Sequence, residues 1–94
     1  MKKFVNEVDN ILSESLIGFG KAHSEIIKVN LSPDFVFRKN KPNKEKVSII
    51  SGGGSGHEPL HGGFVGYGML DAACPGQVFS APTPDQMEAA SNEV

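Results

Sequence analysis

A β-branched run followed at once by a dense glycine segment most constrains what this chain can fold into. Val47-Ser48-Ile49-Ile50 is apolar and bounded by turn residues, which is typical of a buried strand of a parallel sheet. Nine of the 11 glycines follow it, at positions 52, 53, 54, 56, 62, 63, 66, 68 and 76. Glycine is costly in chain entropy, so such a density requires a cause.

Two causes of the glycine density remain open: a winding surface loop, or a loop whose backbone amides closely approach a small ligand. Its position favours the ligand, because open α/β sheets bind ligands beyond the carboxyl ends of their strands. Pro59 suits the first turn of a helix after the glycines. A strand, a glycine turn and a helix N-terminus form a site for anions or polar oxygens. His57 and Glu58 would then stand at the helix entrance.

The glycine segment does not fit the known nucleotide-binding patterns. A phosphate-binding Walker loop ends in Gly-Lys followed by Ser or Thr, and no such ending is present. A dinucleotide fingerprint requires a third glycine, but His57 takes that place in segment 52–57 and Asp71 takes it in segment 66–71. We therefore expect no nucleotide to bind through this segment.

The run His57-Glu58-Pro59-Leu60-His61 formally matches the His-Glu-x-x-His pattern of zinc proteases. That pattern binds zinc only when both histidines lie one turn apart on a helix. Pro59 is tolerated only near a helix start, which leaves His57 at or before the cap. We therefore expect no metal site, and we expect His61 to be structural or partly exposed.

The N-terminal segment has the spacing of an amphipathic helix. Its apolar stripe consists of Phe4, Val8, Leu12 and Leu16, widened by Val5, Ile11 and Phe19. Gly18 and Gly20 are expected to end this helix, since glycine is favoured just beyond a helix C-terminus.

Shorter elements follow the first helix. Strands are expected at 26–31 and 35–37 around a turn at 32–34, with a polar loop at 40–44 and a third core strand at Val78-Phe79. Thr83 is expected to cap a final helix, with Pro84 at its first position and Gln86 three residues after the cap. No glycine, proline or basic last turn closes this helix at Val94, so we expect the natural chain to continue. The order of elements indicates an α/β fold.

Composition excludes several function classes. The chain has 94 residues, a net charge of -2, 38% hydrophobic and 21% charged residues, which is typical of a soluble globular protein. The acidic balance disfavours nucleic acid as a partner, and no stretch approaches membrane-spanning length. The single cysteine, Cys74, allows no internal disulfide and fits a cytoplasmic protein.

Basic residues cluster locally after the second expected strand. They are Arg38, Lys39, Lys41, Lys44 and Lys46. A solvated loop is the favoured interpretation, and a docking patch for an acidic partner is the alternative.

Two long runs together with Lys21-Ala22-His23 resemble the dihydroxyacetone kinase family, specifically the subunit or domain that holds the triose. The first run is Ser51 to Pro59, and the second runs from Ala73-Cys74-Pro75-Gly76-Gln77-Val78-Phe79 to Asp85. The resemblance covers essentially the whole chain. It implies that residues 1–94 are the N-terminal portion of a larger α/β domain, with a glycine-rich loop after a central strand.

The resemblance also implies a chemistry and a set of site residues. Family members phosphorylate dihydroxyacetone, which a histidine holds covalently as a hemiaminal, while a second histidine and an aspartate assist proton transfer. His57 corresponds to that second, catalytic histidine, and histidine suits a general base because it titrates near neutrality. Gly53, Gly54, Ser55, His57 and Ser80 are the expected substrate-binding residues.

Some family features are altered or missing in this chain. Ala81 stands beside Ser80 where the family has a serine, which leaves one hydroxyl contact open. The covalent histidine and the aspartate have no counterpart here, so we expect the 94 residues to be inactive alone. Glu58 either orients His57 or favours the helix N-terminus electrostatically, and the second role is preferred.

The resemblance further implies partners. The phosphoryl donor, ATP or a nucleotide recharged by the sugar phosphotransferase system, is expected on another subunit or domain, so this chain needs no cofactor of its own. Partners would be a nucleotide-binding kinase subunit, a phosphocarrier subunit and a second copy in a homodimer. Two alternatives remain: a non-catalytic dihydroxyacetone sensor that co-activates a transcription regulator, and a plain α/β domain whose glycine loop binds nothing.

Overall fold

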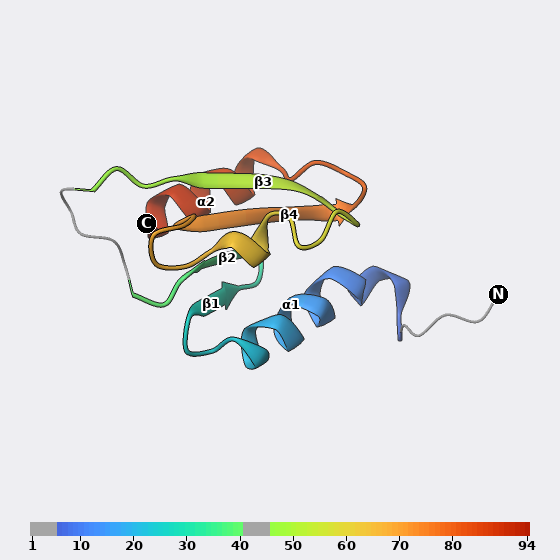
Figure 1. The fold of residues 1–94 in the computed structure, drawn as a ribbon. Helices are drawn as coiled ribbons and strands as arrows, with labels where there is room; N and C mark the ends of the chain where they lie inside the picture. The colour runs from blue at the N-terminus through green and yellow to red at the C-terminus, as the bar shows by residue number, and fades with distance from the viewer. Residues whose placement is uncertain (1–5, 41–45) are drawn as a thin grey trace.

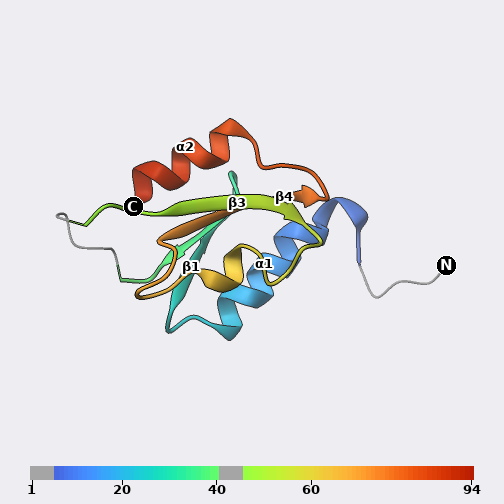
Figure 2. The same ribbon diagram turned by 45° about the horizontal axis from the view of Figure 1, so that its top comes forward.

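The computed structural model describes residues 6–40 and 46–94. They form a mixed four-stranded sheet with one helix on each face (Figure 1). The elements are η1 (Val8–Asn10), α1 (Ile11–Ala22), β1 (Ile27–Asn30), β2 (Phe35–Arg38), β3 (Ile50–Ser55), η2 (Gly62–Phe64), β4 (Ala72–Val78) and α2 (Pro84–Glu93). The strand order is β1-β2-β4-β3, with β3 parallel to β4 and the other pairs antiparallel. The expected α/β class is confirmed, and Figure 2 shows α1 and α2 on opposite sides of the sheet.

Each face of the sheet has its own small core, because successive side chains of a strand point to opposite faces. Val36 and Ala73 face α1, where they join Leu12, Leu16, Ile27 and Val65. Phe35, Ala72 and Cys74 face α2 and pack with Ala90. Burial raises the pKa of the Cys74 thiol to about 11, so Cys74 packs as a small uncharged side chain.

Helix α1 does not end at its glycines. It runs through Gly18 and Gly20 to Ala22, so the prediction that these glycines terminate it is wrong. A Cβ at Gly20 would lie 2.9 Å from Cγ2 of Val29. Gly20 therefore allows α1 to approach β1 closely, and this tertiary contact outweighs the low helix propensity of glycine. Phe4 and Val5 lie outside the described residues.

Strand β3 is shifted from its expected place. It begins at Ile50 and includes the first glycines, whereas Val47 is 82% exposed and Ile49 is 55% exposed. The predicted buried strand over Val47–Ile50 is therefore wrong, and β3 lies at an edge of the described sheet rather than at its centre. A Cβ at Gly52 would lie 2.7 Å from the carbonyl oxygen of Cys74. Close pairing with β4 thus explains why poor strand formers form a strand here.

Strand β4 is the element that sequence patterns missed. It spans Ala72–Val78, and its first three residues are fully or almost fully buried between the helices. The prediction of a core strand at Val78-Phe79 is wrong, since Val78 is 48% exposed and Phe79 is 69% exposed. Alanine, proline and glycine have little strand propensity, so burial between two layers determines this strand.

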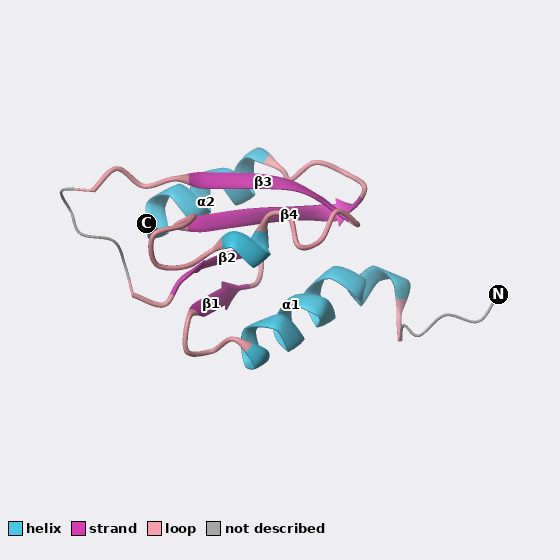
Figure 3. Ribbon diagram, in the orientation of Figure 1, coloured by secondary structure: helices cyan, strands magenta, loops and turns pink. Residues whose placement is uncertain are grey.

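Helix α2 begins as predicted (Figure 3). Thr83 Oγ1 accepts a hydrogen bond from the Gln86 backbone at 3.4 Å, and the Gln86 side chain accepts one from the Thr83 backbone at 2.9 Å. The Gln86 amide also donates to the carbonyl oxygens of Asp34 at 2.7 Å and Pro75 at 2.6 Å. This capping box therefore fixes the helix and ties its start to β4. Within the described residues, neither helix has the length and apolarity needed to cross a membrane.

Candidate functional site

The expected site residues come together where β3 ends beside the turn that follows β4. Gly53, Gly54 and Ser55 are the last residues of β3, and His57 follows two residues later. Ser80 lies in the turn after β4, and its backbone abuts Gly54. Two segments that are distant in sequence therefore meet here.

The backbone of Ser80 packs so closely on Gly54 that it excludes any side chain at position 54. A Cβ at this position would lie 2.8 Å from the backbone nitrogen and 2.9 Å from the carbonyl oxygen of Ser80. No side chain fits at such distances from backbone atoms, so only glycine allows the turn to approach β3. The Ser80 backbone nitrogen donates to the carbonyl oxygen of Gln77 at 2.9 Å, which closes the turn.

Ser55 has a structural hydrogen bond. Its buried hydroxyl donates to the carbonyl oxygen of Gly76 at 2.8 Å, and its own carbonyl oxygen accepts from the Phe79 backbone at 2.6 Å. The hydroxyl oxygen keeps its capacity to accept a hydrogen bond. Ser55 therefore joins the end of β3 to β4 and to the turn that follows β4.

His57 does not stand at a helix entrance. Residues 56–61 form turns, and the next helical residues are those of η2, so the prediction that Pro59 opens a helix is wrong. Segment 56–61 consequently provides no helix N-terminus to bind an anion. The His57 imidazole is exposed and packs edge-on against the Phe79 ring, with 5.0 Å between centroids and 85° between planes.

Glu58 does not stand at a helix N-terminus, because residues 56–61 form turns, so its preferred electrostatic role is wrong. Its carboxylate instead accepts a hydrogen bond from the backbone nitrogen of Gly56 at 2.9 Å. Gly56 has a φ of 111°, in the left-handed region that favours glycine. Glu58 and Gly56 thus shape the sharp bend that presents His57.

His61 is structural, as expected. Its Nδ1 lies 3.0 Å from the hydroxyl oxygen of Ser51, and a Cβ at Gly53 would lie 2.7 Å from its Nε2. The imidazole therefore packs directly on the glycine strand. Because residues 57–61 are not helical, His57 and His61 do not form the histidine pair of a zinc protease.

Asp71 anchors the segment that leads into β3, a role that the sequence patterns did not indicate. Its fully buried carboxylate accepts hydrogen bonds from Arg38 at 3.0 Å, Lys46 at 2.6 Å and the backbone of Ile49 at 2.7 Å. Burial raises the pKa of Asp71, but these three hydrogen bonds outweigh it and hold the pKa below its ordinary value.

The basic cluster is therefore not simply a solvated loop. Arg38 is only 6% exposed and pairs with Asp71, as does Lys46, whose side chain is 37% exposed. The favoured interpretation is wrong for these two residues. Lys41 and Lys44 lie outside the described residues.

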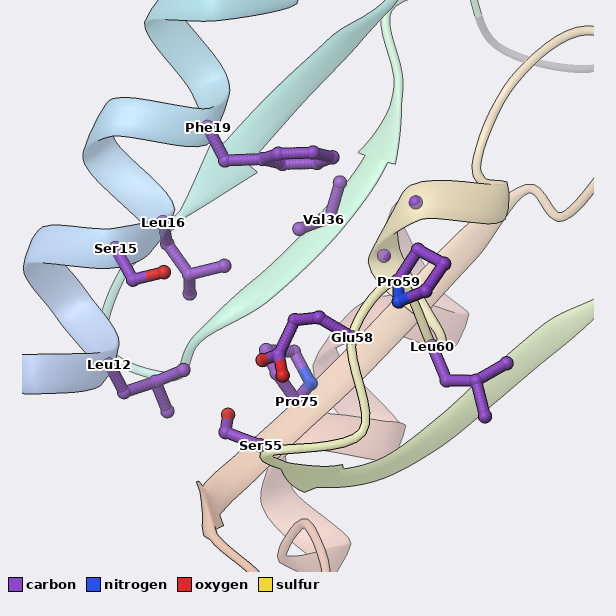
Figure 4. A pocket seen from close by; sticks show the side chains of 12 residues that line it. Leu12, Ser15, Leu16, Phe19, Val36, Ser55, Glu58, Pro59, Leu60 and Pro75 are labelled. Carbon is purple, nitrogen blue, oxygen red and sulfur yellow. The ribbon is translucent and has the colours of Figure 1, made fainter.

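A separate pocket of about 400 Å³ lies between α1 and the segment that follows β3 (Figure 4). Its walls are mostly apolar and include Leu16, Phe19 and Val36. It shares Ser55 with the candidate site, but His57 does not line it. A polar triose suits the backbone amides at the end of β3 better than this apolar pocket, because burying unpaired polar groups is costly.

Comparison with known proteins identifies the family. The Dak1 domain matches residues 17–94. The chain belongs to this family. The resemblance to dihydroxyacetone kinases that the sequence runs indicate is thereby confirmed.

Relatives of the Dak1 family include the dihydroxyacetone-binding subunit of the PEP-dependent dihydroxyacetone kinase of Escherichia coli, 48% identical over 87 residues. The alignment covers 93% of this chain and 24% of that protein. The corresponding subunit of the PTS-dependent kinase of Lactococcus lactis is 45% identical over 87 residues, covering 92% and 26%. The chain thus spans about a quarter of the length of these curated relatives.

Solved structures have the same fold. The dihydroxyacetone kinase of C. freundii, crystallised with AMP-PNP and Mg²⁺, matches with a TM-score of 0.89 and 38% identity, over 99% of this chain and 18% of that one. A dihydroxyacetone kinase operon co-activator matches with a TM-score of 0.75 and 36% identity, over 94% and 26%. The Dak1 fold of this chain is therefore similar to that of kinases and of a co-activator.

Proposed function

We propose that this chain is the triose-binding part of a dihydroxyacetone kinase, which transfers a phosphoryl group to dihydroxyacetone in the full-length protein. One observation supports the proposal most: the end of β3, His57 and the Ser80 turn converge in a Dak1 chain. Relatives at 44–48% identity are named dihydroxyacetone-binding kinase subunits.

The chemistry of the converging groups suits this reaction. Gly53 and Gly54 bring backbone groups to the surface of the site without side-chain bulk, and backbone amides can bind the oxygens of a small ketose. The primary hydroxyl of the triose must lose a proton as it attacks phosphorus, and the exposed imidazole of His57 can accept it. Ser55 and Ser80 complete the substrate contacts. The hemiaminal histidine and the aspartate come from other parts of the protein, so the 94 residues alone are inactive.

The phosphoryl donor binds elsewhere in this proposal. The PEP-dependent and PTS-dependent names of the relatives support a nucleotide-binding subunit and a phosphocarrier subunit as partners. An ATP-binding domain in the same chain is the other arrangement. In either case, the kinase would act as a homodimer in the cytoplasm.

A second candidate is a non-catalytic sensor that binds dihydroxyacetone and co-activates a transcription regulator. The structural match to the operon co-activator, with a TM-score of 0.75, supports this second candidate. The kinase structure matches better, with a TM-score of 0.89. His57 within its complete run also favours the kinase.

The test is turnover by the full-length protein with dihydroxyacetone, supplied with ATP or with the complete donor subunits. The kinase proposal predicts dihydroxyacetone phosphate, and His57→Ala should lower kcat by about 10²–10⁴, the typical contribution of a general base. His23→Ala is the matched control, because His23 contacts Phe19 rather than the site. Binding of dihydroxyacetone without any product would support the sensor. Full activity of His57→Ala would refute the assignment of His57.

A further inference from the structure

Phe79 has an unusual backbone conformation for a large aromatic residue. Its φ is 53°, in the left-handed region that bulky residues rarely adopt. The residue is 69% exposed, so burial in a core does not compensate for the conformation. Strain of this kind persists only where the surrounding structure imposes it, and it concentrates at functional sites.

The surrounding structure holds the Phe79 backbone against the end of β3. Its nitrogen donates to the carbonyl oxygen of Ser55 at 2.6 Å. The next residue, Ser80, abuts the backbone of Gly54 and of Gly76, at both of which a Cβ would collide with it. The turn therefore has no freedom to let Phe79 relax.

This backbone places the Phe79 ring over the bend that presents His57. A Cβ at Gly56 would lie 2.7 Å from Cζ of the ring, so the ring lies directly on Gly56. The ring then meets the His57 imidazole edge-on at 5.0 Å, a favourable geometry for an aromatic pair. Phe79 thus packs against His57 from the turn that follows β4.

We propose that Phe79 is a positioning residue that holds the His57 imidazole in the orientation needed to accept the proton of the triose hydroxyl. The role rests on the proposed kinase function and deepens it. An exposed histidine can occupy several rotamers, and a fixed aromatic neighbour selects among them. Phe79 acts through His57 and does not itself contact the reacting atoms.

Three substitutions of Phe79 and one control, all in the full-length protein, test the role. Phe79→Leu removes the aromatic pair and should lower kcat by roughly three- to tenfold, the value of such a pair, with KM little changed. Phe79→Tyr keeps the ring and should retain wild-type kcat. Phe79→Gly relieves the left-handed φ, so it should lower kcat while the thermal midpoint stays level or rises. Phe64→Leu, at another partly exposed phenylalanine on η2, is the control and should keep wild-type kcat.

A spectroscopic measurement separates positioning from general structural support. In protein labelled with ¹³C at histidine Cε1, the His57 signal, assigned with His57→Asn, should move in Phe79→Leu because the ring current is lost. It should stay in place in Phe64→Leu. An unmoved His57 signal, or unchanged kcat in Phe79→Leu, would overturn the role of Phe79 while leaving the kinase function intact.

Two further outcomes would also overturn this role. If Phe79→Gly loses stability and kcat together, Phe79 supports the fold rather than the histidine. If the wild-type protein makes no dihydroxyacetone phosphate with any donor, the proposed function fails, and the catalytic role of Phe79 fails with it.

Discussion

Replacement of Asp71 by asparagine should destabilise the protein by about 3–5 kcal/mol, the usual cost of breaking a buried ion pair. The asparagine has nearly the same shape but no charge. It leaves the guanidinium of the buried Arg38 without its buried counter-ion. The side-chain amide nitrogen of the asparagine is also a hydrogen-bond donor, so it would face the donors that now bind the carboxylate of Asp71.

The two partners of Asp71 contribute unequally to this cost. The Arg38 side chain is 7% exposed and the Asp71 side chain is fully buried, so water does not screen their attraction. The Lys46 side chain is 37% exposed, and its contribution should be about 1 kcal/mol or less. Lys46→Ala should therefore be several times milder than Asp71→Asn.

The Asp71 carboxylate should also make stability depend on pH. Its pKa in the folded protein lies below the ordinary value of 3.8. The stabilisation is therefore fully present above about pH 4 and is lost as pH falls through the lower, folded pKa. Asp71→Asn should flatten this acid limb of the stability profile.

The assay combines urea unfolding of the full-length protein with native-state hydrogen exchange at Ile49. The Ile49 amide donates to Asp71 at 2.7 Å, so its exchange reports the local anchor directly. Asp9→Asn, at an exposed carboxylate in η1, is the control and should change neither measurement. A loss below about 1 kcal/mol in Asp71→Asn, with Ile49 still protected, would show that Asp71 is not a buried anchor.

Two further predictions concern the helices. Gly18→Ala should raise stability by about 0.5–1 kcal/mol, because Gly18 is an interior helix position with open space around it. Gly20→Ala should not raise stability, because the added Cβ would lie 2.9 Å from Val29. Equal gains in urea midpoint for the two glycine variants would contradict this. Thr83→Ala should cost about 1 kcal/mol by removing the cap of α2. Thr83→Ser should retain the stability. If Thr83→Ser lowers the thermal midpoint as much as Thr83→Ala does, the hydroxyl of Thr83 does not cap the helix.

Sequence patterns predicted the elements whose signals are local. The start of α2 is fixed by the side chains of Thr83 and Gln86 themselves, so the sequence shows it directly. Strands β1 and β2 were predicted within about a residue because their apolar residues are β-branched or aromatic. The convergence of the expected site residues also agrees with the sequence runs, although their roles stay predictions.

The features that were missed depend on contacts between distant segments. Strand β4 consists largely of weak strand formers that burial between two helices makes extended. Gly20 in α1 and Gly52 in β3 allow close packing against Val29 and Cys74, respectively, and such contacts cannot be recognised from the neighbouring residues in sequence. The left-handed φ of Phe79 is imposed by β3 and cannot be read from its neighbours in sequence.

The proposed triose site is tested by locating bound dihydroxyacetone in the full-length protein by amide chemical-shift mapping during a titration. We expect the changes to concentrate on Gly53, Gly54, His57 and Ser80, while Phe19 in the apolar pocket stays unaffected. Changes confined to the apolar pocket, or a saturating titration that leaves the end of β3 unperturbed, would contradict the proposed site.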